Sequence, residues 1–219
     1  MRIAVVGNDG QFEEFTQKFG ELHECIQYTD HEFVENNENY DAVFDFSISD
    51  SPENYSYYQE YEGLLFLNTI QTTLTELSVF YEIDQTHTFG FNGMSTFVNR
   101  SLLELTAFDH SDQNLLESLQ TEYKIVDDRV GMVTPRIVCM IINEAFYTVQ
   151  EGTANRQDID LGMKLGTNYP MGPFEWLEKM GIDQVYELLE ALYEDTKEER
   201  YKICPALKKD YLIYQATLQ

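Results

Sequence analysis

Short apolar runs separated by polar segments fill the first part of the chain. They cover residues 2–7, 23–28, 42–46 and 64–67. Each run has the length of a buried strand, and the first ends at Gly7, where a turn can begin. Strands that alternate with helical stretches favour a parallel sheet with crossover helices.

Apolar residues at helical spacing predict the helices. Phe12, Phe15 and Phe19 predict a helix after the first strand, with Gly20 as its stop. From about Gly131 the period changes, and two further helices are predicted on these apolar positions: Val138, Ile141, Ile142, Ala145 and Val149, and then Ile182, Val185, Leu188, Leu189 and Leu192. Strand-like alternation does not stand out after residue 131.

This change of period predicts two domains. We place the boundary near Asp128, with an α/β domain at residues 1–128 and an all-helical domain at residues 129–219. A chain of 219 residues is long enough for two such domains, each with its own core.

Charge divides the chain in the same way. Residues 1–123 hold 23 acidic and three basic residues, a net charge of −20, whereas residues 124–219 have a net charge of −5. So acidic a surface repels phosphate backbones and excludes nucleic acid as a partner. It is either a well-solvated surface or one that attracts a basic protein partner.

Other functional classes find little support. No run of 18 apolar residues exists, so we expect no membrane-spanning helix, and the chain shows no signal-peptide core. Cys25, Cys139 and Cys204 lie far apart, without the spacing of a metal site or a disulfide framework. We therefore expect a cytoplasmic protein without a bound metal.

The segment 167–176 (Thr-Asn-Tyr-Pro-Met-Gly-Pro-Phe-Glu-Trp), which follows 158–164 (Asp-Ile-Asp-Leu-Gly-Met-Lys), carries the clearest motif. Two prolines around Gly172 make a rigid turn between helices. The order of helix, turn, aromatic pair and second helix resembles the C-terminal domain of the 3-hydroxyacyl-CoA dehydrogenases. This resemblance implies a reduced Rossmann-like sheet domain, followed by a helical domain that forms a homodimer.

Weaker matches extend the resemblance to the α/β half. Residues 64–77 are similar to the family's strand that leads into Asn-Thr-Ser-Ser. Residues 89–93 (Phe-Gly-Phe-Asn-Gly) resemble His-Phe-Phe-Asn-Pro, and residues 131–136 resemble Gly-Phe-Val-Val-Asn-Arg. One large departure is the family's helical insertion after the second strand, which helps to clamp the CoA ester. Only about ten residues separate Asp30 from Asp41 here.

The resemblance implies NAD as the cofactor, with Gly7, Gly10 and Asp30 as its binding residues. In place of Gly-x-Gly-x-x-Gly the chain reads Gly7-Asn-Asp-Gly-Gln-Phe12. Asp9 adds a negative charge where the pyrophosphate would approach, and Phe12 fills the third slot; a shifted turn on Gly10 is the alternative. The sequence therefore predicts weak NAD binding or none.

The family's catalytic positions are mostly replaced. Aligned on the motifs, the histidine that acts as general base falls on Phe89, the serine on Ile70 and the asparagine on Pro135. The glutamate that orients the histidine corresponds to Glu104, if about three extra residues precede it. Only one of these four positions keeps the family's residue, so the chain cannot catalyse the reaction in the way that the family does.

His87 is the candidate for a relocated base. If its segment is extended, it lies on the same face as Phe89, about 6–7 Å away. The remaining histidines, His23, His31 and His110, have no partner spacing and are predicted to be surface residues.

Two functions from different classes follow. One is a catalytically impaired, dehydrogenase-like protein that acts through dimerisation or through a protein partner. The other is an active NAD-dependent oxidoreductase of a 3-hydroxyacyl-CoA or a related acyl substrate in fatty-acid metabolism.

Overall fold

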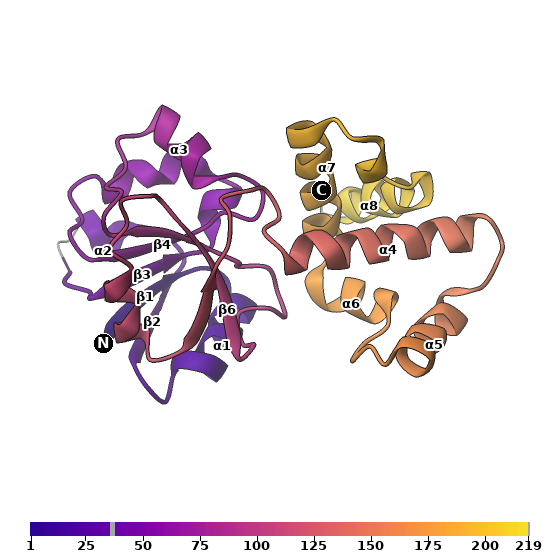
Figure 1. The fold of residues 1–219 in the computed structure, drawn as a ribbon, viewed down its shortest axis with the longest axis horizontal. Coiled ribbons are helices and arrows are strands. Elements are labelled where there is room, and N and C mark those ends of the chain that lie inside the picture. Colours follow the sequence, from indigo (N-terminus) through magenta and orange to yellow (C-terminus); the bar gives the residue numbers. More distant parts are fainter. Residues whose placement is uncertain (36–37, 219) are drawn as a thin grey trace. The chain divides into compact units, whose positions relative to one another are not determined.

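The computed structural model describes residues 1–35 and 38–218. The chain divides into two compact units, Met1–Met132 and Val133–Gln219. Figure 1 shows a sheet with flanking helices in the first unit and helices in the second. The predicted fold class, α/β followed by all-α, is confirmed.

A seven-stranded sheet organises the first unit. Its strands are β1 (Arg2–Val6), β2 (Glu24–Tyr28), β3 (Ala42–Asp45), β4 (Leu64–Asn68), β5 (Thr88–Phe91), β6 (Leu102–Ala107) and β7 (Glu122–Ile125). Their order in space is β2-β1-β3-β4-β5-β6-β7. All neighbouring pairs are parallel except β5 and β6, which are antiparallel. The four predicted strands are confirmed; β5, β6 and β7 were not predicted as strands.

Phenylalanine rings fill the core on one face of the sheet. Phe44, Phe66 and Phe89 are neighbours in register on β3, β4 and β5. The ring centroids of the first two lie 4.2 Å apart, and those of the last two 5.6 Å apart. Helix α1 (Asp9–Phe19) covers this ladder with Phe15 and Phe19, both fully buried. Its predicted position and its end at Gly20 are confirmed.

Further short helices cover the sheet: Gln113–Leu119 packs into the same core as α1, and the others pack into the core on the opposite face. They are α2 (Glu32–Glu35), α3 (Leu74–Phe80) and the 3₁₀ segments Ser47–Ser49, Pro52–Tyr58 and Gln113–Leu119. Asp128 accepts hydrogen bonds from the amides of Leu74 and Thr75 at 2.9 and 2.8 Å, and so caps the start of α3.

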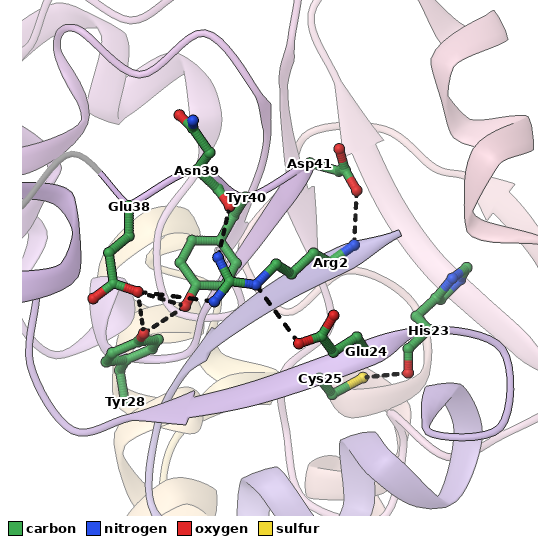
Figure 2. A network of polar contacts seen from close by, with 9 residues as sticks. All are labelled: Arg2, His23, Glu24, Cys25, Tyr28, Glu38, Asn39, Tyr40 and Asp41. Atoms are coloured by element: carbon green, nitrogen blue, oxygen red, sulfur yellow. Dashed lines mark hydrogen bonds and ion pairs between the residues drawn. The ribbon is translucent and has the colours of Figure 1, made fainter.

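A polar network closes the short connection between β2 and β3 (Figure 2). The hydroxyls of Tyr28 and Tyr40 lie 2.5 Å apart, and both lie within hydrogen-bond distance of one Glu38 carboxylate oxygen. The guanidinium of Arg2 lies 4.5 Å from the centre of the Tyr40 ring. Burial raises the pKa of Tyr40, helped by these hydrogen bonds, so its hydroxyl stays protonated. Tyr28, Tyr40 and Glu38 thus hold the connection between β2 and β3. The family that this chain resembles has a helical insertion at this place.

The prediction that His23 and His31 are surface residues is wrong, since both side chains are buried. His31 Nε2 lies 2.8 Å from the carboxylate of Asp45, which is fully buried at the end of β3. The Tyr58 hydroxyl donates to the same carboxylate oxygen at 2.8 Å. His23 Nε2 lies 3.0 Å from the carbonyl oxygen of Leu119. The sequence around His23 and His31 does not indicate these contacts, because their partners Leu119 and Asp45 are distant along the chain.

Up to residue 218, the second unit consists of five helices and one 3₁₀ turn (Glu199–Tyr201). They are α4 (Thr134–Gln150), α5 (Arg156–Thr167), α6 (Pro173–Met180), α7 (Ile182–Thr196) and α8 (Pro205–Thr217). The two helices predicted here are confirmed as α4 and α7, and most of their predicted apolar positions are buried. In the described part of the chain, no helix is both long enough and apolar enough to cross a bilayer.

Side chains that cap α6 explain the Pro-Met-Gly-Pro motif. The Asp160 carboxylate accepts the Phe174 amide at 2.8 Å, and Glu175 accepts the Gly172 amide at 2.9 Å. A Cβ on Gly172 would lie 2.2 Å from the Asp160 carboxylate oxygen, so only glycine leaves room for this cap. The ammonium of Lys164 pairs with Glu175 and lowers the pKa of that carboxyl.

We expect Gly172→Ala to lower the free energy of unfolding by about 1–3 kcal/mol, because the new methyl group displaces Asp160 from its amide. Gly162→Ala is the matched control: it lies in a helix with open space around its Cβ, and should raise stability by up to about 1 kcal/mol. Trp176, the single tryptophan, reports the unfolding of this unit by fluorescence in urea. Equal effects of the two substitutions would contradict the capping argument.

Candidate functional site

The carboxyl ends of four parallel strands form the edge at which a nucleotide-binding sheet holds its ligand. Gly7 follows β1, Phe46 follows β3, Thr69 follows β4 and Asn92 follows β5. Neighbours of β1 in the sheet are β2 and β3, so the direction of winding reverses between β1 and β3. Ligands of such sheets bind outside the carboxyl ends at this reversal.

The start of α1 lies at this point and is capped by its own side chains. Asn8 Oδ1 accepts the Gln11 amide at 3.0 Å, and Gln11 Oε1 accepts the Asn8 amide at 2.9 Å. The Gly7 amide donates to the Tyr28 carbonyl at 2.9 Å. A pyrophosphate needs such amides as donors, and three of them already have acceptors within the chain.

Side chains surround Gly7 closely, so this position has no room for a Cβ. A Cβ on Gly7 would lie 2.7 Å from Gln11 Oε1 and 3.3 Å from the Phe46 ring. Gly10 is more open, with Asn8 Oδ1 at 3.4 Å. Asp9 accepts a hydrogen bond from Gln27 Nε2 at 3.0 Å, so its charge stands beside the turn. These bonds and the charge of Asp9 bear on the predicted weak binding of NAD, which stays a prediction.

Asp30, predicted to bind the cofactor ribose, reaches the same edge of the sheet as Gly7. Val6 and Tyr28 are register partners at the ends of β1 and β2, and Asp30 follows two residues later. Its exposed carboxylate accepts the Glu32 amide at 3.0 Å, at the start of α2. The structure thus brings the three predicted cofactor residues to one edge, where the role of Asp30 stays a prediction.

Glu104 is buried on β6, and the strand register identifies its neighbour. Phe89 pairs with Ala107 and Phe91 with Leu105. The next position along, Asn92, donates its amide to the Glu104 carbonyl at 3.1 Å. Residues opposite one another in an antiparallel pair share a face of the sheet, with Cα atoms about 5.5 Å apart. The side chain beside Glu104 is therefore that of Asn92 and not that of Phe89.

This register gives the general-base position a different placement from the motif alignment. If a glutamate orients the base across β5 and β6, the base position is Asn92. Phe89 belongs to the aromatic ladder on the other face. The motif alignment missed Asn92 because it placed the family's histidine on Phe89 and then needed about three extra residues before Glu104. The pairing of β5 with β6 places Asn92 opposite Glu104 without such a gap.

Asn92 belongs to a set of buried amide side chains at this edge. Asn68 Oδ1 accepts the Gly93 amide at 3.1 Å, and its Nδ2 donates to the Phe46 carbonyl at 3.2 Å. A Cβ on Gly93 would lie 2.6 Å from the Asn68 carboxamide. Asn68 therefore ties together the ends of β3, β4 and β5. A signal for this edge is present in the sequence, since an asparagine follows the apolar residues of both β4 and β5.

His87 lies at the amino end of β5, opposite the carboxyl ends of the parallel strands. It precedes β5, whereas Asn92 follows it, and five extended residues span about 16 Å. His87 Nδ1 lies 2.7 Å from the carboxylate of Asp84, and this hydrogen bond lowers the pKa of Asp84. The structure therefore does not bring His87 together with Glu104 or with Gly7. A catalytic role for His87 stays a prediction that this geometry disfavours.

The two other replaced positions have structural roles. Ile70 is buried after β4, and its carbonyl accepts the Gly131 amide at 2.7 Å. Pro135 lies in the first turn of α4, where its missing amide costs nothing. Among the described residues, no group of three or more His, Cys, Asp or Glu could hold a metal ion.

A polar hollow of about 850 Å³ lies near the connection shown in Figure 2. Glu38, Asp41, Glu60 and Glu62 line it together with several tyrosines. Four carboxylates make it a poor site for an anionic cofactor.

Comparison with known proteins identifies the helical domain. The sequence model of the family described as 3-hydroxyacyl-CoA dehydrogenase, C-terminal domain, matches residues 131–213. Residues 131–213 therefore form a C-terminal domain of the 3-hydroxyacyl-CoA dehydrogenase family. Members of the family are NAD-dependent.

Curated relatives support the assignment. The chain is 41% identical over 108 residues to 3-hydroxyadipyl-CoA dehydrogenase of Escherichia coli, which is 48% of this chain and 23% of that protein. It is 31% identical over 153 residues to a probable 3-hydroxybutyryl-CoA dehydrogenase of Bacillus subtilis, which is 67% of this chain and 53% of that protein. The chain therefore spans at most about half of the length of these relatives.

Solved structures share the whole fold. FadB2 of Mycobacterium tuberculosis superimposes with a TM-score of 0.76 at 16% identity, over 98% of this chain and 94% of that one. The (S)-3-hydroxybutyryl-CoA dehydrogenase PaaH1 of Ralstonia eutropha gives 0.71 at 18% identity, over 95% and 92%. At these identities the likeness shows the fold alone: a Rossmann-like sheet followed by the family's helical domain, as predicted.

We expect Asn92→His to place an imidazole beside Glu104, with a pKa raised by that carboxylate. The double variant Asn92→His/Glu104→Gln should lose this increase, which NMR titration of the introduced ring measures. Phe89→His is the comparison: it removes a ring of the core ladder and should destabilise the protein by about 3 kcal/mol or more. If the imidazole at position 92 had the same pKa with and without the Glu104 carboxylate, the register argument would be contradicted.

Proposed function

We propose that this protein is a member of the 3-hydroxyacyl-CoA dehydrogenase family whose own dehydrogenase reaction is impaired, and that it acts through association of its helical domain. The start of α1 carries the first part of this proposal, the impaired reaction. The amides of Asn8 and Gln11 are each bound by the side chain of the other, and Asp9 places a negative charge beside them. A dinucleotide would have to displace both side chains and overcome that charge.

The catalytic positions support the same proposal. The side chain beside Glu104 is a carboxamide, which does not accept a proton at neutral pH. An imidazole in this place would be both a base and a partner for Glu104, and the nearest histidine in sequence, His87, lies at the opposite edge of the sheet. The positions assigned to the substrate-binding serine and asparagine hold Ile70 and Pro135, which offer no side-chain hydrogen bond.

The connection between β2 and β3 adds a third argument. Of this connection the structure describes only one helix, the four-residue α2, and the network around Tyr28, Tyr40 and Glu38 closes it. The family's helical insertion that helps to hold the CoA ester has no counterpart of similar length.

A second candidate is an active NAD-dependent oxidoreductase of a 3-hydroxyacyl-CoA or related acyl substrate. The names of the curated relatives favour it, since the matches above are to dehydrogenases. In this candidate Glu104 itself would take the substrate hydroxyl proton, because a buried carboxylate can act as a general base. Asn92, beside it, would hold the substrate oxygen by a hydrogen bond.

Cofactor binding separates the two candidates. Calorimetric titration of the full chain with NADH should show no dissociation constant tighter than millimolar, because one unfavourable charge at an anion site already costs on the order of 1 kcal/mol. Asp9→Asn serves as the matched variant and should bind more tightly than the wild type, if binding is detected at all. A micromolar constant for the wild-type chain would favour the active enzyme.

Turnover gives the second test. With 3-hydroxybutyryl-CoA and NAD, we expect no formation of NADH by the wild-type chain, since loss of a general base alone costs on the order of 10²–10⁴ in rate. Turnover near one per second would overturn the proposal. Its loss in Glu104→Gln but not in His87→Ala would then identify Glu104 as the base, and the reverse pattern would identify His87.

A further inference from the structure

Two threonine hydroxyls converge over Gly90 of β5. Thr69 follows β4 and Thr106 lies on β6, and each of these threonines is only 1% exposed. A Cβ built on Gly90 would lie 2.3 Å from Thr69 Oγ1 and 2.2 Å from Thr106 Oγ1. Both oxygens thus approach one point from the two strands beside β5. They are close enough for one small molecule to bridge them, since a water bridge spans up to about 5.5 Å.

Neither hydroxyl oxygen has a hydrogen-bond partner among the residues that the structure describes. Buried hydroxyl groups are nearly always hydrogen-bonded, because an unpaired one costs the free energy of its desolvation. Valine has nearly the shape of threonine and favours strands as well, so packing and propensity do not account for threonine at both positions. The two hydroxyl groups need a partner that these residues do not supply.

Strand register places the two hydroxyls beside Asn92 and Glu104. Gly90 is opposite Thr106 on β6, and the Asn92 amide donates to the Glu104 carbonyl further along the same pair of strands. Glu104 lies two residues from Thr106, so both side chains are on one face of the sheet, about 6–7 Å apart along the strand. The buried carboxylate of Glu104 is therefore within reach of a molecule held by the threonine hydroxyls.

Burial and charge limit what this molecule is. Both threonines are closed to solvent, which excludes a group of a substrate or cofactor that enters from outside. The carboxylate of Glu104 nearby disfavours an anion. A buried water typically makes about three hydrogen bonds to polar groups of the protein. Two threonine hydroxyls and one carboxylate supply that number.

We propose that Thr69 and Thr106 hold one buried water molecule over Gly90, and that this water donates a hydrogen bond to the Glu104 carboxylate. Each threonine hydroxyl donates to the water oxygen, and one water hydrogen points to the carboxylate. Both threonines are thus positioning residues, because through the water they fix the carboxylate that lies beside Asn92. The fold of the sheet alone forms this water site, so it is independent of both candidate functions.

A crystal structure of the full chain gives the direct test. We expect a water molecule at about 2.7–3.0 Å from both threonine Oγ1 atoms and from one Glu104 carboxylate oxygen. Thr106→Val should lose this water, whereas Thr106→Ser, the matched control, keeps the hydroxyl and should keep the water. Two threonine oxygens without a water between them overturn the site. A water out of reach of Glu104 overturns the positioning role.

The sign of the change in stability separates a water-filled site from a dry one. Thr69→Val and Thr106→Val each leave the water with one partner fewer. We expect each to lower the ratio of folded to unfolded protein about fivefold or more. In a dry site the same substitutions remove an unpaired buried hydroxyl and raise that ratio. Urea unfolding followed by circular dichroism measures it, and a rise in either valine variant overturns the proposal.

A double-mutant cycle tests whether the two hydroxyls share one partner. The first valine already releases the water, so Thr69→Val/Thr106→Val should cost clearly less than the sum of its single variants. The matched cycle with Thr69→Ser and Thr106→Ser keeps both hydroxyls, and its effects should add. Additive losses in the valine cycle overturn the shared water.

Discussion

The pairing of β5 with β6 is the constraint on which the functional interpretation depends. Side chains alternate between the faces of a sheet, so one register decides which residues can act together. In this register Phe89 and Phe91 point into the aromatic core, while Gly90 and Asn92 share the other face with Thr106 and Glu104. The core residue Phe89 and the residue beside Glu104, Asn92, thus lie only three residues apart and on opposite faces of the sheet. A shift by one residue would exchange their faces.

At the carboxyl ends of the strands, polar groups of the chain make hydrogen bonds with one another. Asn8 and Gln11 close the start of α1, and Asn68 joins the ends of three strands. A similar arrangement holds the loop between β5 and β6, where the Glu14 carboxylate accepts the amides of Thr96 and Val98 at 2.8 and 2.9 Å. In an active dinucleotide site some of these amides would be donors to a phosphate. Here oxygens of the chain itself accept hydrogen bonds from the amides of Asn8, Gln11, Thr96 and Val98, which stabilises the fold.

In the helical unit, the clearest sequence motif has a structural role. Its Pro-Met-Gly-Pro motif serves the capping of α6 by Asp160 and Glu175, so it identifies the family through packing and not through chemistry. Membership of the family therefore rests on this packing motif.

The sequence by itself determined the fold class, the change from sheet to helices, the family of the helical domain and the acidic character of the α/β half, because these depend on local period, turn chemistry and composition. It did not determine β5 to β7, whose short runs have no clear alternation, or the burial of His23 and His31, whose partners Leu119 and Asp45 are distant in sequence. Only the tertiary structure decided that Asn92 faces Glu104 and that His87 lies at the far edge of the sheet. Strand register and strand direction arise from pairing between segments, and that information is not contained in any one segment.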